Sequence, residues 1–259
     1  MNAPRGVLLD IDGTLTDGLG GPALSGAVET VQRLAARLPV RFVTNTTSRT
    51  RDRLTAELRD AGFTVDPGSI VTPTILARRV LEARGEAEGI LLAEASSLPD
   101  LAWFRRAPEE SARAVLVATE AHTMKIGDLG PSVRALLRGA KLYTLQQNRY
   151  FQRDALVTDL GPVAAFLGYA ANVTWENFGK PSRLLFEALA AELDCALSEL
   201  AMVGDDAEFD ASGALAAGVG QGILVRTGKY RTGDEMRVTP PPTLVCGSIA
   251  EVPAALGLR

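Results

Sequence analysis

Short apolar runs alternate with amphipathic stretches near the start of the chain. Residues 7–9 form an apolar run that stops at polar, turn-forming residues, which is typical of a buried strand that ends in a loop. Residues 28–38 place apolar side chains at helical spacing until Pro39 interrupts them. A second apolar run at 40–43 predicts another strand, and an arginine-rich helix follows it. Strands and helices that alternate over short links predict a parallel α/β sheet.

The far end of the chain repeats this order. A helix at 184–193 follows Pro181, and a strand at 200–203 runs into acidic residues. A helix of small residues then precedes a strand at 222–225. The middle of the chain predicts three more strands and two helices, at 90–92, 114–118, 142–145, 74–84 and 127–138. The pattern therefore predicts an α/β fold over the whole sequence.

Composition narrows the class of protein. Hydrophobic residues make up 46% and charged residues 22% of 259 residues, which is ordinary for a globular chain and argues against disorder. The net charge of −4 argues against a surface that coats nucleic acid. Two cysteines, Cys195 and Cys246, are too few for a disulfide framework, which favours a reducing compartment.

No targeting or membrane segment stands out. The first residues carry no apolar core of a secretory signal. The longest uncharged stretch, 160–175, contains Gly161 and Pro162 and falls short of the ~20 apolar residues that a membrane span needs. We therefore expect a cytoplasmic protein without a membrane or nucleic-acid partner.

Polar residues cluster where predicted strands stop. The clusters are Asp10 with Asp12, Thr44 with Asn45, Asp205 with Asp206 and Asp210, and Lys180 at a helix entrance. Ligands of open parallel sheets bind outside the carboxyl ends of the strands, so clusters distant in sequence can meet there. Several carboxylates at one edge repel one another unless a cation joins them, and hard oxygen ligands favour Mg²⁺. Carboxylates, a lysine and neutral donors together suit a phosphoryl group held against a metal.

The spacing of Asp10 and Asp12 suggests the reaction. In an extended segment, residues i and i+2 project to the same side. One carboxylate could attack phosphorus and form an aspartyl-phosphate, which is an established covalent strategy. The other could protonate the leaving oxygen and then activate the water that releases phosphate. Gly13 permits a tight turn directly after them.

Four motifs in order resemble those of the haloacid dehalogenase superfamily of phosphatases. They are Asp-Ile-Asp-Gly-Thr-Leu at 10–15, Val-Thr-Asn-Thr at 43–46, Gly-Lys-Pro-Ser at 179–182, and Val-Gly-Asp-Asp at 203–206 with Asp210. The resemblance runs over essentially the whole chain. It implies a Rossmann-like core with a parallel sheet and an inserted cap domain.

Motif spacing places the cap. Thr44 lies 32 positions after Asp12, which leaves room for one helix and one strand but no inserted domain. Lys180 lies 136 positions after Thr44, far more than a βα connection of a few residues needs. We expect an α/β cap of the C2 type over residues 74–175, which would select the substrate. The catalytic core would comprise residues 1–73 and 176–259.

The cap position and the Gly-Lys-Pro-Ser motif are similar to the type IIA, NagD-like branch. Within it, residues 40–48, Arg149 with Tyr150, and 225–229 most resemble the phospholysine phosphohistidine inorganic pyrophosphate phosphatase group. The resemblance implies a Mg²⁺-dependent phosphatase that acts on a small phosphorylated metabolite. Sugar phosphates, nucleoside monophosphates, pyridoxal phosphate, pyrophosphate and phosphoamino acids all stay open. Caps in this branch often pair, which leaves a homodimer open as well.

The resemblance also implies roles for the polar clusters. Asp10 would be the nucleophile and a metal ligand. Asp12 would be the acid and base, with its backbone carbonyl on the metal. Lys180 would neutralise charge between Asp10 and the phosphoryl group, which Thr44 and Asn45 would bind.

The fourth motif would complete the metal site. Asp205 would ligate Mg²⁺, and Asp210 would hold the ligands in place from behind. Many members of the branch have Asn where this chain has Asp206, so whether Asp206 touches the metal stays open. In the cap, Asn148, Arg149 and Tyr150 are the candidates for substrate contacts. His122, the one histidine, suits a structural or substrate-lining role better than catalysis.

Other interpretations of the same residues remain. Asp205, Asp206 and Asp210 could be helix-capping acids, and Lys180 could simply precede a helix that begins with Pro181. A phosphotransferase or mutase of the superfamily would use the same nucleophile, but its cap usually lies between the first two motifs. A receiver-like domain that is phosphorylated on Asp and binds a partner would be about half this length and would need no insert.

Overall fold

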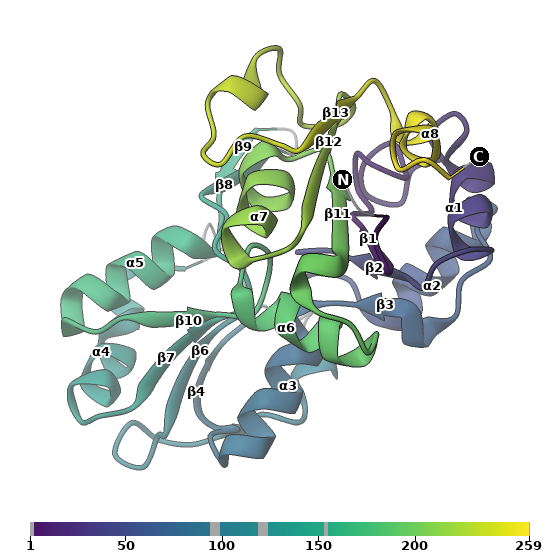
Figure 1. Cartoon of the computed structure of the whole chain (residues 1–259). Helices are drawn as coiled ribbons and strands as arrows, with labels where there is room; N and C mark the ends of the chain where they lie inside the picture. Colours follow the sequence, from purple (N-terminus) through teal and green to yellow (C-terminus); the bar gives the residue numbers. More distant parts are fainter. Residues whose placement is uncertain (1–2, 94–98, 119–123, 153–154, 259) are drawn as a thin grey trace. The chain divides into compact units, whose positions relative to one another are not determined.

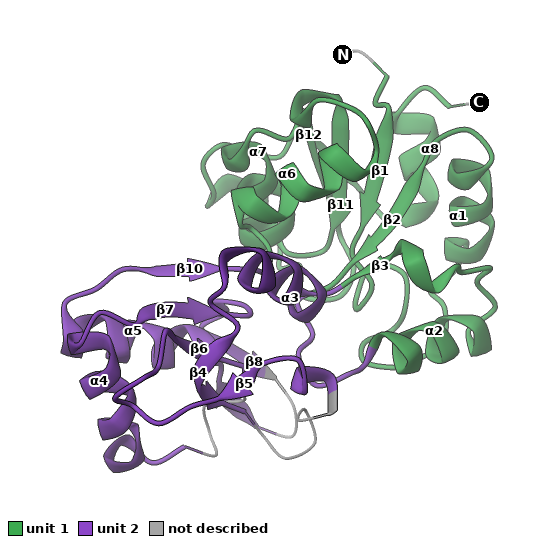
Figure 2. Cartoon of the chain, turned by 90° about the horizontal axis from the view of Figure 1, so that it is seen from below, with its two compact units in different colours: residues 1–44, 51–71, 180–259 green, residues 45–50, 72–179 purple. Residues whose placement is uncertain are grey.

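The computed structural model describes residues 3–93, 99–118, 124–152 and 155–258 and divides the chain into two compact units (Figure 2). The first unit comprises Met1–Thr44, Arg51–Val71 and Lys180–Arg259. The second comprises Asn45–Thr50 and Thr72–Gly179. The chain thus leaves the first unit at Asn45 and again at Thr72, and it returns at Arg51 and at Lys180.

A parallel six-stranded sheet forms the centre of the first unit, in the order β13-β12-β11-β1-β2-β3 (Figure 1). Its strands are β1 (Gly6–Leu9), β2 (Val40–Val43), β3 (Ile70–Val71), β11 (Leu200–Gly204), β12 (Gln221–Val225) and β13 (Leu244–Cys246). Strands β1, β11 and β12 are buried along their whole length. Burial on both faces explains why they are continuous apolar runs without alternation.

Helices cover both faces of this sheet. They are α1 (Ala27–Ala35), α2 (Arg51–Asp60), α6 (Arg183–Glu192), η7 (Ala207–Ser212), α7 (Gly213–Ala217) and α8 (Val252–Ala255). In Figures 1 and 2, α6 and α7 lie on one side of the sheet, and α1 and α8 lie on the other. The larger core cluster joins Val7 and Leu9 of β1 to Leu34 of α1 and Val252 of α8.

The chain order creates a switch point between β1 and β11. From β1 the chain proceeds outward to β2 and β3, whereas from β11 it proceeds outward in the opposite direction to β12 and β13. Helical connections on the two halves therefore cover opposite faces, since such crossovers are right-handed. A ligand site is expected beyond the carboxyl ends of the two strands at such a point.

The second unit contains its own parallel sheet, in the order β10-β7-β6-β4-β5. The strands are β4 (Glu88–Leu92), β5 (Arg105–Arg106), β6 (Ala114–Val117), β7 (Lys141–Thr144) and β10 (Trp175–Asn177). The helices are α3 (Pro73–Arg84), α4 (Gly130–Leu137) and α5 (Leu160–Ala171), and β8 (Tyr150–Gln152) pairs antiparallel with β9 (Leu156–Thr158). Central strand β6 is fully buried.

Helix α5 was not predicted from the sequence. It is apolar almost throughout, so it lacks the polar face by which a helix is recognised. Pro162 lies near its start, where a missing N–H costs little, and the Asp159 carboxylate accepts a hydrogen bond from the N–H of Leu160 at 2.8 Å. The two- and three-residue strands β3, β5, β10 and β13 are too short for a periodic signal.

The predicted fold class is confirmed. Two parallel sheets with helices make up an α/β architecture, and one sheet has the strand order of an open, doubly wound core. No helix within the described ranges is long and apolar enough to cross a membrane.

Leucines of the second unit provide a matched test of this packing. Leu116 on β6 is completely buried, whereas Leu137 at the end of α4 is 65% exposed. We expect Leu116→Ala to lower the free energy of unfolding by about 2–5 kcal/mol, because it leaves a cavity. Leu137→Ala should change it by no more than about 0.5 kcal/mol. Urea unfolding followed by circular dichroism measures both, and equal losses would contradict the described core.

Candidate active site

Three buried carboxylates meet at the switch point of the first sheet. Asp10 directly follows β1 and Asp205 directly follows β11, and the strand register pairs Leu9 with Val203. Asp210 reaches the same place from η7. One ligand oxygen of each residue lies within 4.8 Å of the others, and the residues are 6%, 1% and 1% exposed. Paired parallel strands therefore bring together acids that are almost 200 positions apart in sequence.

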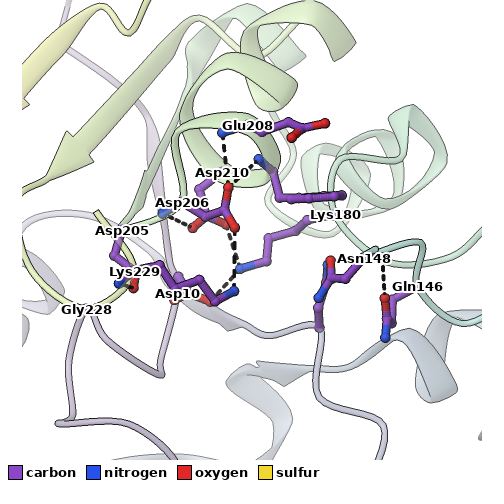
Figure 3. Close-up of polar contacts among 12 residues, drawn as sticks. Asp10, Gln146, Asn148, Lys180, Asp205, Asp206, Glu208, Asp210, Gly228 and Lys229 are labelled. Carbon is purple, nitrogen blue, oxygen red and sulfur yellow. Dashed lines mark hydrogen bonds and ion pairs between the residues drawn. The ribbon is translucent and has the colours of Figure 1, made fainter. Parts of the chain in front are cut away.

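Lys180 lies among these carboxylates and is itself buried (Figure 3). Its Nζ donates a hydrogen bond to Oδ1 of Asp10 and lies 2.7 Å from Oδ1 of Asp210. Burial alone would lower the pKa of Lys180, but the charges of Asp10 and Asp210 outweigh it and hold the pKa above its usual value. The ammonium group therefore stays charged and bridges the first and fourth motifs.

The ammonium groups of Lys180 and Lys229 do not balance the four carboxylates of Asp10, Asp205, Asp206 and Asp210. Burial, reinforced by the charges of Asp10 and Asp210, raises the pKa of Asp205 to about 8. Burial also raises the pKa of Asp210 to about 7; Lys180 opposes this rise, and Asp10 and Asp206 add to it. Burial and repulsion between the carboxylates thus both favour the protonated form, and a divalent cation would oppose both effects.

The donor atoms fit such a cation. Asp205 Oδ2 accepts a hydrogen bond from the backbone N–H of Lys229 at 2.6 Å. Asp205 Oδ1, by contrast, is buried and has no hydrogen-bond partner among the described residues. Leaving a buried carboxylate oxygen unpaired is costly unless something outside the chain binds it. The ligands are all oxygens, as Mg²⁺ prefers.

The start of η7 orients the fourth motif. Asp206 Oδ1 accepts hydrogen bonds from the N–H groups of Glu208 and Phe209, both at 3.0 Å, so Asp206 is a helix cap. The backbone N–H of Asp206 donates to Asp210 Oδ2 at 3.1 Å. Gly204 makes room for this, since a Cβ there would lie 2.1 Å from the same oxygen. The capping interpretation therefore applies to Asp206, while Asp205 and Asp210 join the cluster.

One further residue of the first motif contacts this cluster. Thr14 is fully buried, and its Oγ1 donates to Asp10 Oδ2 at 3.3 Å. Thr14 belongs to the first motif, but neither the spacing nor the family resemblance gives it a role. Thr44 directly follows β2 and is 3% exposed. Asp12 is half-buried at the beginning of a turn. Its carboxylate does not belong to the cluster that Asp10, Asp205 and Asp210 form.

The remaining predicted residues belong to the second unit. Asn45 Nδ2 donates to Oδ1 of Asn148 at 3.4 Å, so the second motif contacts a predicted substrate residue. The N–H of Asn148 in turn donates to Oε1 of buried Gln146 at 2.6 Å. Arg149 and Tyr150 are exposed. His122 lies outside the described residues.

The sequence profile of the Haloacid dehalogenase-like hydrolase family matches residues 7–101, and a related HAD-hydrolase-like profile matches residues 177–252. The haloacid dehalogenase-like hydrolase domain-containing protein 2 of Rattus norvegicus is 36% identical over 94% of this chain and 92% of its own length. The phospholysine phosphohistidine inorganic pyrophosphate phosphatase of Bos taurus is 34% identical over 89% of this chain and 86% of its own length.

Two solved structures are similar over nearly the whole chain. The glycerol phosphate phosphatase of Mycobacterium tuberculosis, solved in complex with magnesium, has a TM-score of 0.79 and 25% identity, covering 96% of this chain and 78% of that one. NagD from Escherichia coli K-12 has a TM-score of 0.81 and 20% identity, covering 96% and 98%. The second of these likenesses concerns the fold alone.

Replacing Lys180 tests the electrostatic account of the cluster. We expect Lys180→Met to lower the free energy of unfolding in EDTA by about 3–5 kcal/mol, because it leaves buried carboxylates without their cation. Lys141, 62% exposed and 2.6 Å from Glu86, provides the control. Lys141→Met should cost no more than about 1 kcal/mol. Chemical denaturation compares the two, and a Lys180→Met variant as stable as its control would refute the account.

Proposed function

Because the chain belongs to the haloacid dehalogenase-like hydrolases, in the type IIA, NagD-like phosphatase branch that its four motifs predict, we propose that it is a Mg²⁺-dependent phosphatase. It hydrolyses a small phosphorylated metabolite through an aspartyl-phosphate on Asp10. One observation carries the proposal: buried Lys180 bridges Asp10 and Asp210, while Asp205 Oδ1 beside them has no hydrogen-bond partner among the described residues.

Asp10 is the nucleophile. Its carboxylate oxygen forms a bond to phosphorus as the bond between phosphorus and the leaving oxygen breaks. Lys180 and Thr14 hold the carboxylate in place, and the charge of Lys180 offsets negative charge that develops on the phosphoryl oxygens. Because these groups are positioned before substrate arrives, little reorganisation accompanies the step.

Asp12 is the general acid and base, as the family resemblance implies. Its carboxyl group gives a proton to the leaving oxygen in the first step. As a carboxylate it then takes a proton from the water that attacks phosphorus, which releases inorganic phosphate and regenerates Asp10. Thr44 and Asn45, which follow β2, are assigned to binding of the phosphoryl group.

Asp10, Asp205 and the backbone carbonyl of Asp12 would hold Mg²⁺, with Asp210 behind them. When bound, the cation supplies Lewis-acid stabilisation and neutralises repulsion between the carboxylates and the phosphoryl group. The magnesium complex of the similar M. tuberculosis phosphatase supports this choice of metal. The excess of carboxylates over the ammonium groups of Lys180 and Lys229 supports it independently.

Substrate selection is assigned to the second unit, with Asn148, Arg149 and Tyr150 as contact residues. The names of the relatives point to small phosphorylated compounds and leave the class among several open. A homodimer and a cytoplasmic location remain predictions from the sequence. A panel of phosphorylated metabolites with phosphate release as the readout identifies the preferred class.

The metal requirement can be tested with p-nitrophenyl phosphate. Purified protein should release p-nitrophenol with Mg²⁺, and EDTA should reduce the rate by at least about 10³-fold, since the cation supplies several kcal/mol of transition-state stabilisation. Excess Mg²⁺ should restore the rate. Absence of Mg²⁺-dependent release would instead favour the non-enzymatic phospho-aspartate interpretation.

Asp10→Asn tests the nucleophile. The amide has nearly the same shape but cannot form the covalent intermediate, so turnover should fall by at least about 10⁴-fold while the thermal unfolding curve stays cooperative. Asp17, an exposed aspartate seven positions later, is the matched control, and Asp17→Asn should retain wild-type turnover. Turnover by Asp10→Asn at even a few per cent of the wild-type rate would eliminate the proposed role.

A further inference from the structure

Residues 227–229, here called the 227–229 loop, follow β12 and contact both sides of the switch point. Thr227 Oγ1 donates a hydrogen bond to the carbonyl oxygen of Gly13 at 2.5 Å. The N–H of Lys229 donates to Asp205 Oδ2 at 2.6 Å. The loop thus joins the turn after the nucleophile to a carboxylate of the fourth motif. Neither contact is explained by the roles assigned above.

Two glycines make these contacts sterically possible. Gly13 and Gly228 have φ of +87° and +54°, in the left-handed region that disfavours other residues. A Cβ on Gly13 would lie 2.1 Å from Asp205 Oδ2, and one on Gly228 would lie 1.9 Å from the same oxygen. The Cβ on Gly228 would also lie 2.6 Å from the Cα of Gly13. Two backbone segments therefore enclose one oxygen of Asp205.

The two oxygens of Asp205 consequently have different environments. Oδ2 is enclosed by Gly13 and Gly228 and bonded to the N–H of Lys229. Oδ1 is buried without a hydrogen-bond partner in the described part of the chain. We propose that the 227–229 loop is a positioning element that holds Asp205 through Oδ2 and so presents Oδ1 alone to the catalytic cation. This inference rests on the proposed metal-dependent function.

The physical benefit is a fixed carboxylate. The terminal torsion of Asp is broad, so an unrestrained Asp205 could turn either oxygen, or both, toward a cation. Mg²⁺ requires strict geometry and keeps several waters, which one-oxygen coordination allows. Groups that orient a metal ligand typically change metal affinity by about 10- to 100-fold. The Thr227 hydroxyl contributes by fixing the Gly13 carbonyl against the loop.

Isothermal titration calorimetry with Mg²⁺ tests the proposal on the full chain. Thr227→Val removes the hydroxyl at nearly constant volume, and Gly228→Ala places a methyl group against Asp205 Oδ2. Each should raise the dissociation constant for Mg²⁺ by about 10-fold or more. Their KM for p-nitrophenyl phosphate at saturating Mg²⁺ should stay at the wild-type value. Thr227→Ser, which keeps the hydroxyl, should restore wild-type affinity.

Gly233→Ala is the matched control for backbone strain. Gly233 has φ of +87°, and an added Cβ would meet no atom within 4 Å. It should lower thermal stability without changing Mg²⁺ affinity. The proposal is overturned if Thr227→Val and Gly228→Ala, folded by circular dichroism, bind Mg²⁺ as tightly as wild type, although the proposed function would then stand. It is also overturned if Gly233→Ala weakens binding equally. A wild-type protein that binds no Mg²⁺ and hydrolyses nothing overturns both.

Discussion

The buried ion pair between Lys180 and Asp10, extended to Asp210, is the interaction on which the site depends. Removing charged groups from water costs several kcal/mol for each ion, and attraction repays this cost only with good geometry. Here the pair joins the residue that follows β1 to the residue that opens the return of the chain into the first unit. Any arrangement that separates them leaves a charge buried and unpaired. The same interaction therefore holds the first and third motifs together and orients the carboxylate of Asp10, the proposed nucleophile.

This constraint explains the unusual amount of glycine around the cluster. Aspartate side chains are short, so their carboxylates can gather only where the backbone segments that carry them also come close. Gly204 leaves space for Asp210, and Gly13 and Gly228 leave space for Asp205. A Cβ at any of them would lie only 1.9–2.1 Å from a carboxylate oxygen, so that carboxylate would have to move. The glycines and acids thus lie together, although they come from three segments, at the carboxyl ends of β1, β11 and β12.

Much of the core could be predicted from the sequence, because its strands are marked by short stretches of neighbouring residues. Asp10 and Asp205 follow apolar strands whose period and length are readable, and parallel strands end at one edge. Asp210 is predicted to hold the metal ligands in place, and its carboxylate lies beside those of Asp10 and Asp205 because η7 turns it back toward Gly204. That turn depends on the Asp206 cap, which spacing alone does not reveal. The role of Asp210 in holding the metal ligands in place stays a prediction.

Other features depend on packing between distant segments. Thr227 contacts Gly13 across more than 200 positions of sequence, and Lys229 contacts Asp205 across more than 20. No periodicity in the sequence predicts either contact. Helix α5 was missed because it is apolar on nearly all sides, and the link from Asn45 to Asn148 spans 103 positions. The identity of the substrate depends on such contacts in the second unit, which is why the chemistry could be predicted further than the specificity.

We propose that a divalent cation completes the buried carboxylates and binds Asp205 through Oδ1. Diffraction from crystals grown with Mn²⁺, which accepts the same oxygen ligands as Mg²⁺, tests it most directly through the anomalous signal of the metal. The account predicts a peak in contact with Asp10 and with Oδ1 of Asp205, while Oδ2 keeps its hydrogen bond to the N–H of Lys229. A crystal without a peak at this cluster, or with the metal on Oδ2, would contradict it.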